Sequence, residues 1–177
     1  MKRLLICLPL LALGCSVPRS VPEGNVVAGK TINVEGKVLI LAVIDGQEQG
    51  QAPANGSGRG MVSALRKTLM QHGISISTSE ATSQIQGLEE AGKLGFDYVL
   101  KCVITEWEDN ATAWSGKGDK LRISIDMFDV KSKSMVAASS HYRIATGFTF
   151  VSGTPDRFMD ECATGALSQI YRWPTVK

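Results

Sequence analysis

Hydrophobic and polar positions recur along this chain with two periods, and the changes of period mark its elements. Residues 38–44 form a continuous apolar run, which is typical of a strand buried on both faces. Over 58–72 apolar residues recur every three or four positions, which predicts a helix. Residues 74–77 alternate as a second strand, and helical spacing returns over 81–94, with Gly95 expected to end that helix. The expected apolar face of this second helix consists of Ala81, Ile85, Leu88, Ala91 and Leu94.

The second half of the chain changes to antiparallel patterns. Residues 96–107 are the longest apolar stretch of the expected domain and predict a third strand. Strict alternation over 121–127 predicts a fourth strand with one solvated face, and 136–144 predicts a fifth. Thr154-Pro155-Asp156 provides an N-cap, an N1 proline and a first-turn acid for a last helix, which Pro174 stops.

These elements predict a single three-layer α/β domain with the order β-α-β-α-β-β-β-α. Right-handed crossovers make the first three strands parallel, and the two hairpins make the last pair antiparallel. The simplest result is a mixed five-stranded sheet of order 2-1-3-4-5. The first and third strands would be its central pair, with Val43 and Val103 buried, and the polar face of the fourth strand would meet water or a partner.

The N-terminus has the pattern of a secretion signal. Lys2 and Arg3 precede a short apolar run over 4–13, which is too short to span a bilayer because a spanning helix needs about 20 residues. Gly14-Cys15 resembles the bacterial lipoprotein box, with Ala12 where that box prefers Leu. The resemblance implies cleavage before Cys15, acylation of this cysteine with fatty acids such as palmitate, and, through Ser16, sorting to the outer membrane. The alternative is an ordinary signal that leaves Cys15 as a free thiol.

The domain boundaries follow from this signal. We expect a signal peptide at 1–14, a lipidated Cys15 with a flexible tether over 15–35, and a periplasmic α/β domain over 36–173. The signal holds two of the 19 basic residues, so the mature chain carries 17 basic and 17 acidic residues. This neutrality argues against nucleic acid as a partner.

Two cysteines, Cys102 and Cys162, lie within the expected domain. An oxidising periplasm would permit a disulfide between them, whereas their positions in apolar patterns suit buried free thiols. Both alternatives stay open.

Motifs for catalysis and cofactors are weak. The run from Gly56 to Gly60 lies where nucleotide-binding folds keep a phosphate loop, but its glycine spacing is wrong and it lacks the P-loop lysine. Its Ser57 is instead the expected N-cap of the first helix. Neither His72 nor His141 has a second ligand at metal-binding spacing, and no serine lies in G-x-S-x-G. We therefore expect a non-enzymatic protein without catalytic residues, metal or cofactor.

One group of acids and one group of aromatic residues need a separate interpretation. Glu106, Glu108 and Asp109 flank Trp107 and could suggest paired acids for glycan cleavage, although a solvated strand end explains them better. Aromatic residues near element ends are candidates for partner or membrane binding, unless they only cover the edge of the core. These aromatic candidates are Trp107, Trp114, Tyr171 and Trp173.

Several segments carry a resemblance to a known family. They are Phe96–Cys102, Trp107–Asp109, Ile123–Asp129 with its Lys-Ser-Lys turn, and Thr146–Phe150 before the Thr-Pro-Asp helix start. Over about 36–173 the chain resembles the bacterial lipoproteins of domain-of-unknown-function family 4823. More distantly, its element order is similar to the group of TolB N-terminal, penicillin-binding-protein-activator, curli-secretion and Pel polysaccharide-export lipoprotein domains. The family implies localisation and fold, and the distant group implies binding or assembly.

The expected function is therefore a non-enzymatic binding or assembly domain, lipid-anchored at the periplasmic face of a bacterial outer membrane. Its partners would be the membrane, through the lipid, and an envelope protein or further copies of itself. An alternative is an accessory subunit, including a ring-forming one, of a secretion or polysaccharide-export assembly. Alternatives of other classes are an enzyme acting on glycan or lipid and a small-ligand binder that uses the glycine-rich loop.

Overall fold

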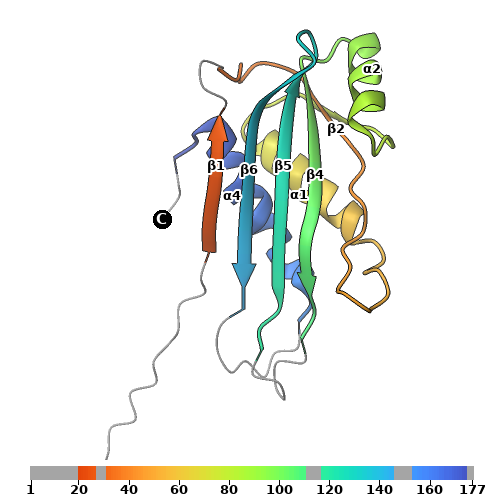
Figure 1. Cartoon of the computed structure of the whole chain (residues 1–177). Coiled ribbons are helices and arrows are strands. Elements are labelled where there is room, and N and C mark those ends of the chain that lie inside the picture. Colours follow the sequence, from red (N-terminus) through yellow and green to blue (C-terminus); the bar gives the residue numbers. More distant parts are fainter. Residues whose placement is uncertain (1–19, 27–30, 111–116, 146–152, 175–177) are drawn as a thin grey trace, which may run out of the picture.

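The computed structural model describes residues 20–26, 31–110, 117–145 and 153–174. The chain forms six strands, three α-helices and one 3-10 helix in these residues (Figure 1). In chain order they are β1 (Ser20–Val26), β2 (Val38–Ile40), α1 (Ser57–Gln71), β3 (Ile76–Thr78), α2 (Gln84–Leu94), β4 (Tyr98–Glu108), β5 (Lys120–Asp129), β6 (Ser134–Ile144), η1 (Pro155–Phe158) and α4 (Met159–Tyr171).

All six strands belong to one mixed sheet of order β1-β6-β5-β4-β2-β3. β2 pairs in parallel with both β3 and β4, and the remaining pairs are antiparallel. The five strands that the sequence predicts are β2 to β6, and they have the predicted order. The predicted α/β fold class is therefore confirmed.

The sixth strand, β1, lies inside the stretch 15–35 that we expected to be a flexible tether. Residues 20–26 pair with β6 along their whole length, from Ser20 opposite Arg143 to Val26 opposite Ala137. The sequence of this segment shows no strand periodicity. Its strand conformation depends on backbone pairing with the edge of β6. The tether prediction is wrong for these residues.

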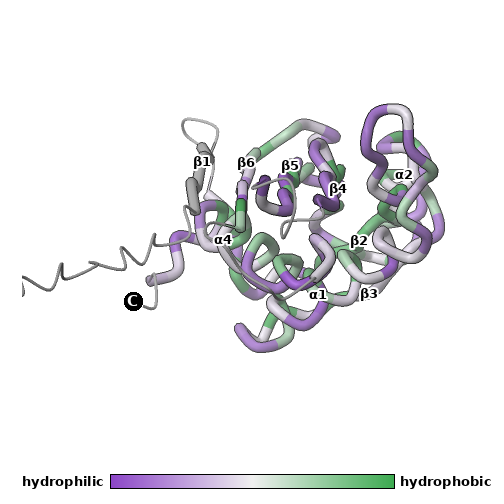
Figure 2. Tube along the Cα trace, turned by 90° about the horizontal axis from the view of Figure 1, so that it is seen from below, coloured by the Kyte–Doolittle hydropathy of each residue, from purple (hydrophilic) through white to green (hydrophobic). Residues whose placement is uncertain are grey.

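Helices cover the two faces of the sheet unequally. Figure 2 shows α1 and α4 on one side of the sheet and α2 on the other, over the end that holds β2 and β3. The main core lies between the sheet and the α1–α4 pair, and it includes fully buried Leu65, Leu100, Ile123 and Leu167. The core under α2 is smaller and consists of Leu39, Leu41, Leu88, Ala91, Val99 and Phe128.

The predicted burial on both faces holds for only part of β2 and β4. Val99 is fully buried under α2, but Val103, further along the same face, is 42% exposed. β2 ends at Ile40, Val43 is only partly buried, and Ile44 is 74% exposed. The reason is the length of α2, whose 11 residues span about 16 Å and so cannot cover the whole of β4.

α2 also buries a narrower face than its sequence pattern predicts. Leu88 and Ala91 are buried, whereas Ile85 and Leu94 are 70% and 61% exposed. Gly87 makes the closest approach, since a Cβ atom there would lie 2.5 Å from the side chain of Leu41. As predicted, Gly95 ends the helix, in the left-handed conformation.

Cys102 and Cys162 are both free and buried in this structure. Burial raises the pKa of each thiol, to about 12 for Cys162. The Sγ atom of Cys162 lies 3.9 Å from the carbonyl oxygen of Leu121, to which it donates a weak hydrogen bond. The free-thiol alternative therefore describes the structure.

Candidate functional site

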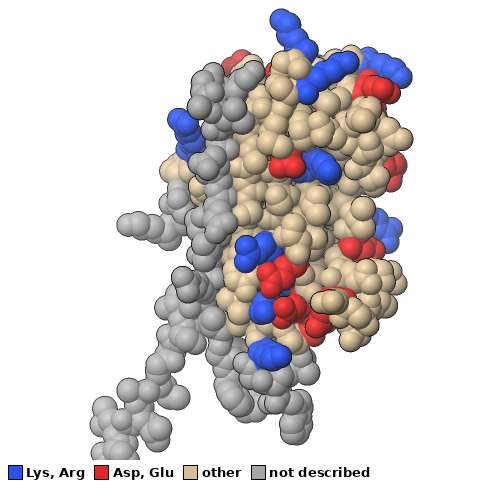
Figure 3. Space-filling view, in the orientation of Figure 1, with Lys and Arg blue, Asp and Glu red and all other residues tan. Residues whose placement is uncertain are grey.

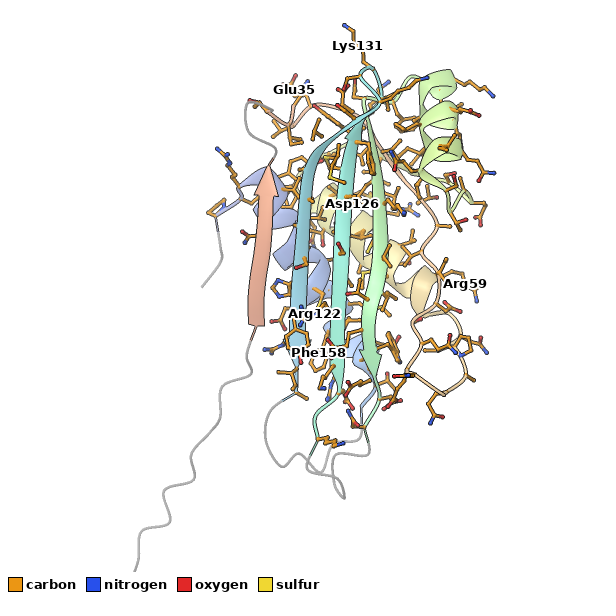
Figure 4. The ribbon with its side chains drawn as sticks, viewed as in Figure 1. Glu35, Arg59, Arg122, Asp126, Lys131 and Phe158 are labelled. Atoms are coloured by element: carbon orange, nitrogen blue, oxygen red, sulfur yellow. The ribbon has the colours of Figure 1, made fainter. Side chains whose placement is uncertain are left out.

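The most distinctive surface is the part of the sheet that α2 leaves uncovered, which we call the open face. It is formed by β4, β5 and β6 on the side away from α1 and α4, and Figure 3 shows charged side chains of both signs grouped on it. Figure 4 shows Arg122 and Asp126 on β5 within it. The open face consists of Lys101, Val103, Glu106, Glu108, Lys120, Arg122, Ser124, Asp126, Ser140 and Tyr142.

Alternation along β5 produces this face. Leu121, Ile123, Ile125 and Met127 are fully buried against the helices, so the residues between them lie on the opposite side. In β4 a register shift between Ile104 and Glu106 changes the alternation. As a result Glu106 and Glu108 join the open face, opposite Arg122 and Lys120, while Trp107 turns into the core.

The charges at the end of the open face near Glu108 are paired with one another. The Nζ atom of Lys120 lies 2.9 Å from a carboxylate oxygen of Glu108 and 3.7 Å from one of Glu106. Arg122 Nε lies 3.3 Å from Glu106, and the guanidinium carbon is 4.5 Å from the centre of the Tyr142 ring. Such a surface presents alternating hydrogen-bond donors and acceptors, and its charges of opposite sign largely cancel. It therefore suits a protein partner better than a polyanion.

Lys101 and Asp126 form a second, looser pair opposite each other on β4 and β5. Burial raises the pKa of Asp126, and the nearby charge of Lys101 lowers it by a smaller amount. Partial burial of a carboxylate without a close counter-ion is unfavourable for folding alone. A partner group that donates a hydrogen bond here would relieve this cost.

A hollow of about 180 Å³ opens beside Lys101. It lies between β4 and the segment that follows the end of β2. Its apolar lining includes the two exposed residues Ile44 and Val103. A cavity of about 150 Å³ can hold a benzene molecule, so the hollow has room for one large apolar side chain. It is lined by Ala42, Ile44, Asp45, Thr82, Lys101, Cys102, Val103 and Ile104.

The glycine-rich loop before α1 is already occupied by a carboxylate of the protein itself. Asp45 accepts hydrogen bonds from the backbone N–H groups of Gly56 at 3.0 Å and Gly58 at 2.7 Å. These bonds hold the pKa of Asp45 below its usual value. Ser57, the expected N-cap, instead accepts a bond from Gly46 N–H at 2.8 Å, and Gly56 is the N-cap. The place that a phosphate would take at the helix N-terminus is therefore filled.

The aromatic candidates do not form one surface. Trp107 is 6% exposed and packs on Gly46, and Tyr171 is 8% exposed at the end of α4. Trp173 is half-buried, with its ring stacked on His72 at 3.5 Å between centroids and on Tyr171 at 4.8 Å. Trp107 and Tyr171 thus expose little ring surface to a partner, while Trp114 and Cys15 lie outside the described residues.

The sequence patterns indicated the open face only in part. Alternation in the fourth predicted strand indicated one polar side of that strand. No sequence pattern indicated that Tyr142 or the hollow beside Val103 belongs to the same surface. The register shift that brings Glu106 and Glu108 to this face has no local signature either. Within the described ranges no three metal-ligating side chains come together, and no helix there is long and apolar enough to cross a membrane.

Comparison with known proteins places the fold. No family model and no curated protein matches the chain, so membership of domain-of-unknown-function family 4823 is not shown. Among solved structures, the PelC dodecamer from Paraburkholderia phytofirmans has a TM-score of 0.67 at 16% identity, covering 86% of this chain and 97% of PelC. Lipoprotein GNA1162 from Neisseria meningitidis has a TM-score of 0.51 at 13% identity, covering 67% of this chain and 88% of that chain. These TM-scores show a shared fold, and at such low identities they show the fold alone.

Proposed function

We propose that this chain is a lipid-anchored, non-enzymatic domain at the periplasmic face of a bacterial outer membrane, where it docks a protein of the envelope. The observation that carries the proposal is the open face, a half-exposed polar sheet surface with an apolar hollow large enough for one side chain. The lipoprotein-like signal that ends at Cys15 supports the location. The fold shared with lipoprotein GNA1162 agrees with it.

The partner can be a second copy of the chain, and one comparison favours this form of the proposal. PelC, which shares the fold over 97% of its length, forms a dodecamer. An accessory subunit that assembles into a ring is therefore our second candidate. A ring needs two different patches that fit each other on neighbouring copies, and the open face would be one of them.

The acids that suggested glycan cleavage support a binding function better. Glu106 and Glu108 are paired with Arg122 and Lys120, and the bond from Lys120 lowers the pKa of Glu108. A general acid needs a raised pKa, and burial and nearby Asp119 raise the pKa of Asp109. Two of the three acids thus serve to order the surface of the sheet.

Site-specific photo-crosslinking in cells tests the proposal. A photoreactive residue in place of Ser124, at the centre of the open face, should give one dominant protein adduct. The matched control is the same residue in place of Arg66, which is exposed on α1 on the other side of the sheet. An adduct with a second copy supports the ring-forming subunit, and an adduct with another envelope protein supports a docking domain. Equal adducts at both positions, or none at Ser124, would contradict the open face as the docking surface.

A further inference from the structure

The position of β1 limits how far the domain can lie from its lipid. Ser20 begins β1 and pairs with Arg143, next to the last residue of β6 (Figure 1). Only five residue steps separate Ser20 from Cys15. At about 3.5 Å per residue, five fully extended steps reach about 18 Å. A tether that ran to residue 36 would have reached about 70 Å by the same measure.

The end of the sheet that holds Ser20, which we call the anchored end, contains a buried carboxylate with several hydrogen bonds. Asp119, directly before β5, is fully buried there and contacts residues that follow β4 and β6 and a residue of η1. Its carboxylate accepts hydrogen bonds from Asn110 N–H at 3.0 Å and from Arg157, and its carbonyl oxygen accepts one from Ala145 N–H at 2.9 Å. Gly118 packs so closely that a Cβ atom would lie 1.8 Å from the carbonyl oxygen of Ala145.

The opposite end of the sheet lies a strand length away. β5 runs from Lys120 at the anchored end to Asp129, and its ten residues span about 33 Å. Figure 4 shows Lys131 and Glu35 at this far end. α4 also runs toward it from η1 (Figure 1), and its last residue, Tyr171, belongs to the same core cluster as Tyr98 at the start of β4. Trp173, stacked on Tyr171, therefore lies at the far end and not beside the lipid.

We propose that the domain stands on its anchored end, with this end against the lipid headgroups and the strands directed away from the membrane. The orientation rests on the proposed lipidation of Cys15. It places the open face at the side of the molecule, where it points along the membrane surface. A face held in this direction meets neighbours that are anchored in the same membrane, including further copies of this chain.

Charge does not provide this attachment. At the anchored end, burial and the nearby carboxylates of Asp119, Asp156 and Glu48 raise the pKa of Asp109, and Arg157 lowers it. The described residues of this end pair basic side chains such as Lys120 and Arg157 with acids, whereas attraction to anionic lipids needs clusters of basic residues. The acyl chains and the short connection to β1 must hold the domain in place.

Energy transfer to the membrane tests the orientation. The lipidated full chain is inserted into phosphatidylethanolamine–phosphatidylglycerol vesicles that contain an acceptor-labelled headgroup lipid. A donor dye is attached through Lys117→Cys at the anchored end or through Lys131→Cys at the far end, both exposed positions. The two buried native thiols compete little for the dye. We expect strong transfer from position 117 and weak transfer from position 131, corresponding to distances that differ by about 30 Å.

Two controls separate the possible failures. Insertion of a ten-residue Gly/Ser segment between Cys15 and Ser20 should reduce the difference between the two positions, because the domain could then turn freely. Vesicle flotation, with Cys15→Ala as the unlipidated reference, is measured first. A chain that does not float overturns both the anchor and the orientation. A chain that floats but shows equal transfer from positions 117 and 131 overturns the orientation alone.

Discussion

At the scale of single residues, Asp45 determines what the glycine-rich loop can do. The loop lies where phosphate-binding folds hold their ligand, but Asp45 already provides the negative charge that the N-terminus of α1 attracts. The carboxylate comes from a residue 11 positions before Gly56. Sequence spacing could not reveal this contact, because the intervening loop has no regular geometry.

Replacement of Asp45 should therefore weaken the fold without removing a binding activity. Asp45→Ala leaves the N–H groups of Gly56 and Gly58 without their acceptor, and capping losses of this kind cost about 1–2 kcal/mol. Urea denaturation followed by circular dichroism measures the change. Asp45→Asn is the matched control and should be intermediate, because it keeps one acceptor oxygen.

The stabilities of the native chain and of Asp45→Ala should depend differently on pH. The folded-state pKa of Asp45 is lowered, so its stabilising contribution is present above the unfolded value of about 3.9 and is lost as the pH falls through the folded value. The stability gap between the native chain and Asp45→Ala should therefore narrow below about pH 4. A gap that stays constant to pH 2 would show that the carboxylate charge contributes nothing.

At the scale of elements, β4 consists of two halves with different surroundings. Its first half lies between α2 on one face and the main core on the other, and its second half has the core on one face only. The apolar pattern along 96–107 is continuous and does not show at which residue α2 stops covering this face of β4. The length of α2 decides it.

This division predicts the cost of a charge on each strand face. Val103→Asp should lower the unfolding free energy by less than about 1 kcal/mol, because the side chain is 42% exposed. Ile125→Asp, on the fully buried face of β5, should cost several kcal/mol because it buries an unpaired charge. Chemical denaturation compares the two, with Ser124→Asp as a control on the open face. A Val103→Asp loss as large as that of Ile125→Asp would mean that the second half of β4 is covered.

At the scale of the whole molecule, β1 changes the predicted five-stranded sheet into a six-stranded one. β1 covers the edge of β6 and places Ser20, five residues after the proposed lipid attachment at Cys15, at one end of the sheet. The proposed orientation toward the membrane and the proposed side-on presentation of the open face both depend on this strand. A flexible tether would have left both undetermined.

Removal of β1 should therefore destabilise the domain and expose a strand edge. A chain that begins at residue 31 leaves the backbone groups of β6 unpaired along residues 137–143, and such edges promote association between molecules. We expect a lower melting temperature and self-association in light scattering, compared with a chain that begins at residue 16. Identical melting and scattering for the two chains would show that β1 is not an integral part of the fold.

Much of the fold could be predicted because its elements have strong local patterns. The apolar periods located three helices and five strands, and the simplest arrangement of their crossovers and hairpins has the strand order of the structure. β1 could not be predicted in this way. It has Pro22 and Gly24, which weaken a strand signal, and it is an edge strand, where such residues are tolerated.

The candidate site shows the same limit. Alternation in β5 indicates a polar face, but the shift between Ile104 and Glu106 exchanges the sides of the residues that follow it. Trp107, expected near a binding surface, lies in the core as a result, and Glu106 and Glu108 become part of the open face. A displacement of one residue in strand pairing reverses every side chain beyond it, and no local pattern shows where it occurs.

The sequence by itself predicts a signal before Cys15, and it determined the periods of the central elements and the order of strands β2 to β6, because these depend on neighbouring residues and on chain chirality. Only the tertiary structure decided that β1 joins the sheet, that α2 leaves the open face uncovered and that Asp45 fills the N-terminus of α1. Each of these depends on contacts between segments far apart in the chain. Such contacts are selected by the shape and the free hydrogen-bonding groups of the assembled core.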